Sequence, residues 1–231
     1  MIDLHTHILP NMDDGSKSLE ETVALLKLLK QQGISTVAAT PHFYAQEAPG
    51  AFLKRRNASL EMLRSIPEED RLNILPGAEV AYFSGIGSSE ALIPLQIGET
   101  KLLLVEMPFG AWSDYVVEDI CEIPIQLGLI PVLAHVNRYP GRDQFPKYKD
   151  VLLAGGVYFQ CNTEAFFTFR SRRWALELLK KGYIHFLGSD SHNLTTRPPR
   201  WTEARAVVEK KLDKSYLDHL DHEARSILNC K

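Results

Sequence analysis

Short apolar runs alternate with longer amphipathic runs along most of this 231-residue chain. The short runs are nearly continuous in apolar residues, as expected for parallel strands that are buried on both faces. Seven such runs cover residues 1–5, 34–40, 72–80, 101–107, 129–135, 157–162 and 183–190. Strands that alternate with helices predict βα units and a parallel sheet. We expect one closed or nearly closed α/β barrel, with a doubly wound open sheet as the alternative.

The longer runs predict helices over residues 18–33, 51–66, 114–128 and 173–182, and a mostly helical tail from Trp201. Ser18 is followed three residues later by Glu21, which predicts a capping box, and Gly33 predicts the end of that helix. Pro124 predicts a kink within 114–128. No repeat, low-complexity segment or linker interrupts the pattern. We therefore expect residues 1–231 to form a single domain.

The composition excludes several classes of protein. A hydrophobic content of 45% supports a packed core, and a net charge of −3 provides no attraction for nucleic acid. No apolar run is long enough to span a bilayer, and the start of the chain lacks the features of a secretory signal. Cys121, Cys161 and Cys230 are widely spaced and odd in number, which suits a reducing compartment. We expect a cytoplasmic protein with no nucleic-acid partner and no membrane insertion.

Histidines and acidic residues recur where the predicted strands end. Eight of them come from six strands: His5, His7, His42, Glu79, Glu106, His135, Asp190 and His192. Asp14, in the loop after the first strand, is a ninth candidate. Because the carboxyl ends of the strands of a parallel barrel lie on one face, these side chains are expected to converge there.

Imidazoles mixed with carboxylates suit divalent ions such as Mn, Fe or Zn. Nine ligands are too many for one tetrahedral ion but suffice for two or three ions bridged by carboxylates. Such a cluster is typical of a hydrolase that acts on a phosphoester or an amide. A single histidine after a strand is more often structural. The prediction of a metal site therefore depends on the recurrence of histidines and acids at the ends of several strands. His185 lies inside the last strand and is expected to be a core residue or a support for the site.

The same residues resemble those of the PHP (polymerase and histidinol phosphatase) superfamily. The resemblance is carried by Asp3-x-His5-x-His7, Pro41-His42, Gly77-x-Glu79, Glu106, His135 and Ser189-Asp190-Ser191-His192. More narrowly, "DLHTHILPNMDDGS", "ATPHF" and "SDSHN" followed by "RPP" look like the bacterial PHP-type protein-tyrosine phosphatases of capsular and exopolysaccharide operons. The resemblance covers essentially the whole chain. It implies a distorted, TIM-like (β/α)7 PHP barrel.

The resemblance also implies roles for individual residues. It makes the eight residues at the strand ends the ligands of three divalent metal ions, usually Mn, with Fe or Zn as alternatives. It places Asp14 at or near the third ion and Arg138 and Arg197 at phosphate-binding positions, so these three residues are the predicted catalytic residues. The family commonly has His-Pro-Glu-Arg-Tyr where this chain has "HVNRY", so Val136 and Asn137 depart from the pattern.

The implied reaction is the hydrolysis of phosphotyrosine on a bacterial tyrosine autokinase with a tyrosine-rich tail, which regulates capsular or exopolysaccharide synthesis. We expect a metal-bound hydroxide to attack phosphorus without a covalent enzyme intermediate. A cysteine nucleophile is excluded for Cys121 and Cys161, because Leu127 and Phe167, rather than arginines, stand six positions after them.

Three alternatives remain open at this point. The first is a small-molecule phosphatase of the histidinol-phosphate type, and the second is a nuclease, which the net charge disfavours. The third is a non-catalytic metal-binding module, which a complete ligand set disfavours. The segment "FRSRRW", with Arg170, Arg172 and Arg173, is either a solvated surface or a device that steers an acidic, phosphorylated tail toward the site.

Overall fold

The computed structural model describes residues 1–139 and 144–228, and Cys230 lies outside these ranges. The strands in chain order are β1 (Ile2–Thr6), β2 (Thr36–Ala39), β3 (His42–Phe43), β4 (Asn73–Pro76), β5 (Glu79–Ala81), β6 (Leu102–Glu106), β7 (Ile130–Leu133), β8 (Tyr158–Asn162) and β9 (Phe186–Gly188). All the strand pairings are parallel. The prediction of a parallel sheet is confirmed.

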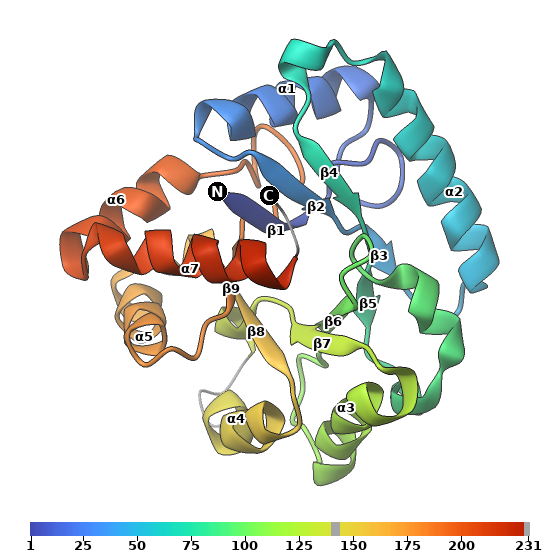
Figure 1. The fold of residues 1–231 in the computed structure, drawn as a ribbon, viewed down its shortest axis with the longest axis vertical. Coiled ribbons are helices and arrows are strands. Elements are labelled where there is room, and N and C mark those ends of the chain that lie inside the picture. The colour runs from blue at the N-terminus through green and yellow to red at the C-terminus, as the bar shows by residue number, and fades with distance from the viewer. Residues whose placement is uncertain (140–143, 229–231) are drawn as a thin grey trace.

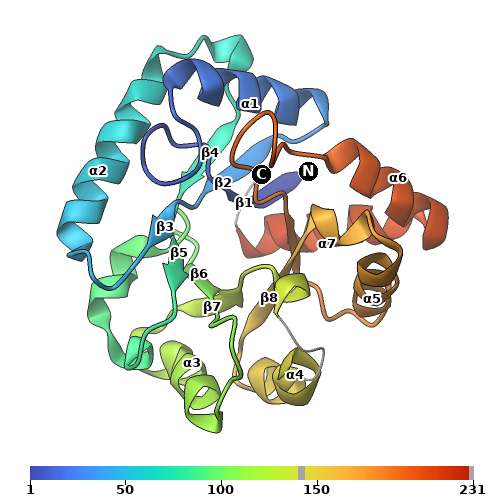
Figure 2. The same ribbon diagram turned by 180° about the vertical axis from the view of Figure 1, so that it is seen from behind.

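The strands form a ring, in the order of the sequence, seen from one end in Figure 1 and from the other in Figure 2. Two hydrogen-bonded ladders, β1-β2-β4 and β3-β5-β6-β7-β8-β9, make up this ring. The chain of β2 continues into β3, and that of β4 continues into β5, so each of these pairs occupies one strand position of the barrel and joins the two ladders. Beyond β9, the N–H of Asp190 donates to the carbonyl of His5 at 2.7 Å, and the N–H of His7 donates to that of Ser191 at 2.9 Å. These bonds connect β1 to the chain after β9, as a closed barrel requires.

Two predicted strands have the wrong extent. The run 34–40 ends early as β2 because Pro41 has no N–H to donate to a ladder, and pairing resumes at His42 in β3. The run 72–80 is divided into β4 and β5 at Gly77, where a side chain would lie 2.9 Å from Ile97 Cγ1. Seven predicted strands therefore appear as nine.

Seven helices surround the strands (Figure 1). In the described residues they are α1 (Leu19–Gln31), α2 (Pro49–Met62), α3 (Asp114–Leu127), α4 (Gln144–Ala154), α5 (Phe169–Lys180), α6 (Trp201–Lys211) and α7 (Lys214–Ile227). The side chain of Ser18 accepts from the N–H of Glu21 at 3.2 Å, as predicted, but the Glu21 carboxylate accepts from Lys17 instead of closing the capping box. Helix α4 was not predicted, because Pro146 in its first turn resembles a helix breaker. None of these helices is long and apolar enough to cross a membrane.

Helix α7 closes the amino-terminal end of the barrel. An inner apolar cluster takes residues from β1, β2, β6, β7 and β9, and it also contains Ala224 of α7 and Leu228 just beyond it. The Asp221 carboxylate accepts a hydrogen bond from the N–H of Ile2 at 2.8 Å, which ties α7 to the start of β1. The carboxyl ends of the strands, at the opposite end of the barrel, are left for polar side chains.

His185 lies just before β9 and is partly buried. Its ring stacks on Tyr158 with 4.5 Å between ring centroids, and its Nδ1 accepts from the N–H of Phe159 at 3.1 Å. Burial lowers the pKa of His185 from 6.5 to about 4. His185 thus packs against β8, and among the described residues no contact joins it to the predicted ligands.

We predict that His185→Asn makes the fold less sensitive to acid. Unfolded chains bind a proton at this histidine below pH 6.5, whereas the folded chain does so only near pH 4, so its stability falls as the pH falls through this window. The shift corresponds to at most about 3 kcal/mol. Asparagine keeps an acceptor for Phe159 but does not titrate. Urea unfolding of both proteins at two pH values measures the difference, and equal acid losses in both would contradict the prediction.

Candidate metal centre

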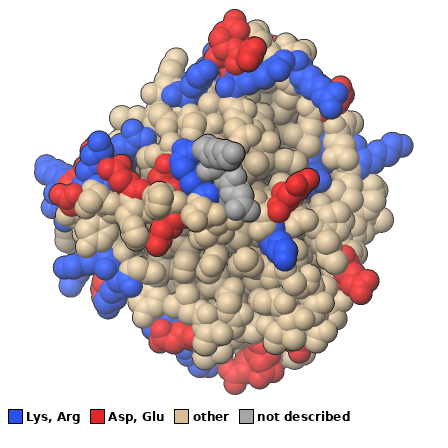
Figure 3. Space-filling model, viewed as in Figure 1, with Lys and Arg blue, Asp and Glu red and all other residues tan. Residues whose placement is uncertain are grey.

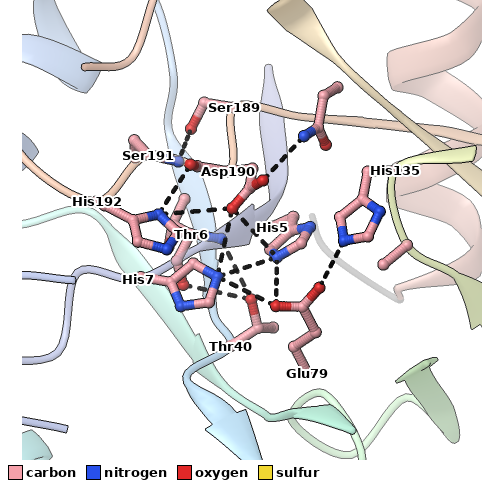
Figure 4. A network of polar contacts seen from close by, with 12 residues as sticks. His5, Thr6, His7, Thr40, Glu79, His135, Ser189, Asp190, Ser191 and His192 are labelled. Atoms are coloured by element: carbon pink, nitrogen blue, oxygen red, sulfur yellow. Dashed lines mark hydrogen bonds and ion pairs between the residues drawn. The ribbon is translucent and has the colours of Figure 1, made fainter. Parts of the chain in front are cut away.

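The predicted ligands lie together at the carboxyl ends of the strands (Figure 4). A bulge in β1 helps to bring the first of them there. Pairing advances three residues on β1, from Asp3 to Thr6, while it advances two on β2, from Val37 to Ala39. The extra residue lets Leu4 pack in the inner apolar cluster while His5, the next residue, faces the acidic centre.

Glu79 is the centre of the cluster and is fully buried. Its Oε2 lies 3.1 Å from His5 Nε2, 3.3 Å from His7 Nε2 and 3.0 Å from His42 Nδ1. Its other oxygen, Oε1, lies 2.9 Å from His135 Nε2. One carboxylate thus faces four imidazoles from different parts of the barrel, an arrangement suited to bridging more than one cation.

Two further carboxylates extend the cluster in opposite directions. Asp190 Oδ1 lies 3.6 Å from His5 Nε2 and 3.4 Å from His7 Nε2. Glu106 Oε1 lies 3.3 Å from His135 Nε2. His135 and Asp190 have positive φ angles of 32° and 52°. This backbone conformation is uncommon outside glycine and accumulates at functional sites.

Asp14 lies at the mouth of the cluster and is 64% exposed. Its Oδ1 lies 3.3 Å from His192 Nε2 and 3.7 Å from His42 Nε2. Three sets of potential ligand atoms lie close enough to hold an ion: His7, Asp14, His42 and His192; His5, His7 and Asp190; and His42, Glu79 and Glu106. Every residue predicted as a ligand therefore touches the cluster, although the assignment of each as a ligand remains a prediction.

The charge balance of the cluster favours ionised carboxylates. Burial opposes charge at Glu79 and Asp190, but the charge of His5 and hydrogen bonds to histidines keep the pKa of both acids well below the usual range. Burial also opposes charge at His7, yet its carboxylate partners raise the pKa of His7 well above 6.5. At His192, burial and the charge of His7 lower the pKa to about 4, so this imidazole remains neutral.

The donor set fits divalent cations. His5 Nδ1 donates to Gln160 Oε1 at 3.3 Å and His7 Nδ1 donates to Asp13 Oδ2 at 2.7 Å. When a cation replaces the proton on Nε2, each ring therefore offers its lone pair from Nε2. These two Nε2 atoms lie 3.1 Å apart and face the same carboxylates. Glu79 Oε2 is buried, and within the described residues none of its three imidazole contacts has the geometry of a hydrogen bond. Converging lone pairs and negative oxygens are what a bound cation requires.

The residues that hold the ligands in place were not among the predicted site residues. Asp13 accepts from His7 Nδ1 and from the N–H groups of His42 and Gly15. Gly15 is needed beside it, because a Cβ there would lie 2.2 Å from the carbonyl oxygen of His7. The first aspartate of the motif "DDG" is the signal in the sequence for this support.

A second supporting chain runs along β8. Gln160 Oε1 accepts from the N–H of His135 at 2.6 Å, and its Nε2 donates to Asn162 Oδ1 at 2.9 Å. Asn162 in turn donates to Asp190 Oδ2 at 2.9 Å. Alternation along the strand, with Cys161 between the two amides, could have indicated that both side chains point toward the site.

Arg138 and Arg197 lie on the rim, as predicted. Arg138 Nη1 lies 2.5 Å from Asp190 Oδ2, and its Nε donates to Glu164 Oε1 at 2.5 Å. Arg197 Nη2 donates to Asp190 Oδ2 at 2.8 Å, and its Nη1 lies 3.7 Å from Asp14 Oδ2. Burial opposes charge at Arg138, yet Glu164 and Asp190 raise its pKa, so the guanidinium stays charged. Both arginines are partly exposed and can meet an anion that enters the mouth.

Asn137, which departs from the family pattern, has a structural contact. Its Oδ1 accepts from the N–H of Asn162 at 2.8 Å. This bond ties the turn that carries Arg138 to the end of β8. Its position supports the rim and leaves the predicted metal ligands untouched.

Comparison with known proteins gives a consistent result. The model of one protein family, described as "Capsular polysaccharide synthesis, CpsB/CapC", matches residues 1–229. Tyrosine-protein phosphatase YwqE of Bacillus subtilis is 32% identical over 219 residues, which cover 91% of this chain and 85% of the relative. Tyrosine-protein phosphatase CpsB of Streptococcus agalactiae is 30% identical, with coverage of 99% of this chain and 98% of the relative.

Solved structures confirm the fold. The crystal structures of YwqE from Bacillus subtilis and CpsB from Streptococcus pneumoniae, described as unique metal-dependent tyrosine phosphatases, include a chain with a TM-score of 0.85 to this one. That chain is 28% identical, and the match covers 100% of this chain and 95% of the other. The phosphotriesterase homology protein of Escherichia coli shares the fold alone, with a TM-score of 0.55, 12% identity and coverage of 94% of each chain.

Proposed function

This chain belongs to the CpsB/CapC family of capsular polysaccharide synthesis proteins, and from that membership we propose that it is a metal-dependent protein-tyrosine phosphatase. The observation that carries the proposal is the buried Glu79 carboxylate among four imidazoles, with two arginines on the rim above it. This arrangement combines a polynuclear metal centre with a place for a phosphate group.

We assign three divalent ions to the cluster. Manganese is the preferred ion, and iron and zinc are alternatives that also suit its donors. The ligands are the eight residues at the strand ends: His5, His7, His42, Glu79, Glu106, His135, Asp190 and His192. Residues 1–231 act as one domain in the cytoplasm. The substrate is the tyrosine-rich tail of a bacterial tyrosine autokinase, and its dephosphorylation regulates capsular or exopolysaccharide synthesis.

When bound, the ions lower the pKa of a water molecule and offset the charge of the phosphoryl group. The planar guanidinium groups of Arg138 and Arg197 bind the phosphoryl oxygens, and Glu164 holds Arg138 in position for this. Asp14, exposed at the mouth, or a histidine beside it lies where it can pass a proton to the leaving phenolate. Because a tyrosine phenol has a pKa near 10, this transfer contributes less than it would for an alkyl leaving group.

Two aromatic rings on the rim favour an aryl substrate. Tyr44 is 49% exposed and stacks on His42 with 5.5 Å between ring centroids. Phe109 is 48% exposed and stacks on His135 at 5.9 Å. Each ring therefore lies beside a predicted ligand with part of its surface open to the phenyl group of phosphotyrosine.

We predict that Phe109→Ala and Tyr44→Ala each reduce kcat/KM for phosphotyrosine by up to about tenfold, since aromatic contacts contribute about 0.5–1.5 kcal/mol. Hydrolysis of phosphoserine, which has no ring to contact, should change by less than about twofold. Phe109→Tyr and Tyr44→Phe keep the rings and serve as controls. Equal losses on both substrates would contradict a role in recognition of the phenyl group.

The proposed function is tested by substrate comparison with the manganese-loaded protein. We expect phosphotyrosine peptide to be hydrolysed with a much higher kcat/KM than histidinol phosphate. The opposite order would support the small-molecule phosphatase instead. Hydrolysis of neither substrate, with metal bound, would reject the proposal.

A further inference from the structure

Four hollows follow one another along α5, each sharing lining residues with the next, and the first lies at the turn that carries Arg138. The first is lined by Val136 and Asn137 of that turn, and it shares Arg170 and Trp174 with the second. The second shares Phe169 and Arg173 with the third, and the third shares Arg172 and Lys211 with the fourth. We call this row of hollows the α5 groove. It leads from the catalytic rim to the end of α6.

The α5 groove is strongly basic. Its lining includes six cationic side chains, namely Arg170, Arg172, Arg173, Lys180, Lys210 and Lys211. Glu177 is the acidic residue among the lining residues, and its carboxylate already accepts from Lys181 at 2.8 Å. Lys and Arg side chains project along the left edge of Figure 3, with acidic side chains between them, where α5 and α6 lie in Figure 1. The whole chain has a net charge of −3, so the charge of this groove is opposite in sign to that of the protein as a whole.

Five of the six cations are not paired with a carboxylate in the part of the chain that the structure describes. Within residues 1–139 and 144–228, no ion pair involves Arg172, Arg173, Lys180, Lys210 or Lys211. Surface cations that are not paired within their own chain attract anionic partners over about 10 Å at moderate ionic strength. Phe169 is 76% exposed beside them, and the Arg172 guanidinium lies 6.0 Å from its ring centroid. The groove therefore offers both positive charge and aromatic surface.

We propose that the α5 groove binds an acidic stretch of the substrate chain next to the phosphotyrosine held in the active site. Val136 and Asn137, which line the start of the groove, belong to the same turn as Arg138, so the groove begins next to the rim of the active site. Its concave shape suits an extended peptide better than a flat lipid surface. The inference rests on the proposed phosphatase function and adds the chemistry of the substrate outside the phosphotyrosine itself.

The test compares three substrates: p-nitrophenyl phosphate, a phosphotyrosine peptide flanked by Asp and Glu, and the same peptide with Asn and Gln at those positions. The wild-type protein should prefer the acidic peptide by roughly tenfold in kcat/KM at low salt. Two double variants should each remove this preference by raising the KM for the acidic peptide: Arg172→Glu/Arg173→Glu and Lys210→Glu/Lys211→Glu. Hydrolysis of p-nitrophenyl phosphate should stay within about twofold, because these residues lie outside the metal centre.

Lys54→Glu/Arg64→Glu is the matched control. It makes the same change in net charge on α2 and just after it, on the opposite side of the ring in Figure 1, and should keep the preference. Equal hydrolysis of both peptides by the wild-type protein, or an equal loss in the control variant, would overturn the proposal. So would binding of phosphatidylserine vesicles through these residues without any peptide preference. Failure to hydrolyse p-nitrophenyl phosphate would instead reject the phosphatase function.

Discussion

Glu79→Gln should abolish both metal binding and activity. The substitution keeps the size of a fully buried side chain but removes the charge that faces His5, His7, His42 and His135. No other carboxylate in the cluster approaches four imidazoles, as far as the described residues show. We expect kcat/KM for p-nitrophenyl phosphate to fall by about 10³-fold or more, equivalent to roughly 4 kcal/mol of transition-state stabilisation.

Elemental analysis of the purified variant provides a readout that does not depend on activity. It should contain less than one equivalent of metal, while its far-ultraviolet circular dichroism should match that of the wild-type protein. Glu90→Gln makes the same chemical change at an exposed position outside the cluster and serves as the control. A Glu79→Gln protein with full metal content and near-normal activity would remove Glu79 from the centre of the mechanism.

Removal of metal by a chelator should have an effect of similar size. Without cations, the Nε2 atoms of His5 and His7 face each other at 3.1 Å beside the Glu79 and Asp190 carboxylates, with no nucleophile activated between them. We expect activity on a phosphotyrosine peptide to fall by at least about 10³-fold, since metal ions lower the pKa of bound water by several units. Addition of Mn²⁺ should restore it.

Thermal unfolding distinguishes loss of metal from loss of fold. Metal that binds only the native state stabilises it by about 2.7 kcal/mol at a free concentration of 100 times Kd, so Tm should fall on chelation and recover with Mn²⁺. The Tm of Glu79→Gln should not respond to Mn²⁺. Activity that survives complete removal of metal would exclude the proposed mechanism, whatever the Tm.

Asp190 connects the two arginines on the rim to the histidines inside the cluster. Asp190 accepts from Arg197 and lies 2.5 Å from Arg138, while its other oxygen faces the imidazoles of His5 and His7. The same carboxylate thus connects the predicted phosphate-binding groups to the predicted metal ligands. Asn162 adds a hydrogen bond to it from β8. A change at Asp190 is therefore expected to disturb both parts of the site together.

Much of the fold could be predicted because its pattern is local. Apolar runs and capping signals such as Ser18 and Gly33 are properties of neighbouring residues, and they identified the strands and most of the helices. The errors arose where backbone chemistry overrode the pattern. Pairing after the run 34–40 is interrupted at Pro41 and resumes at His42, Gly77 divides the run 72–80, and Pro146 lies in the first turn of α4, where it reads as a helix breaker.

The sequence by itself determined the barrel and the convergence of its strand-end histidines and acids, because parallel strands place their carboxyl ends on one face. Only the tertiary structure decided which groups hold the ligands. These groups are Asp13, Gln160 and Asn162. Each contacts a residue that is at least 25 positions away in the chain, and the periodicity of the sequence does not encode such contacts. The same is true of the α5 groove: "FRSRRW" was visible as a basic segment, but its continuity with Lys210 and Lys211 exists only after α6 has folded beside it.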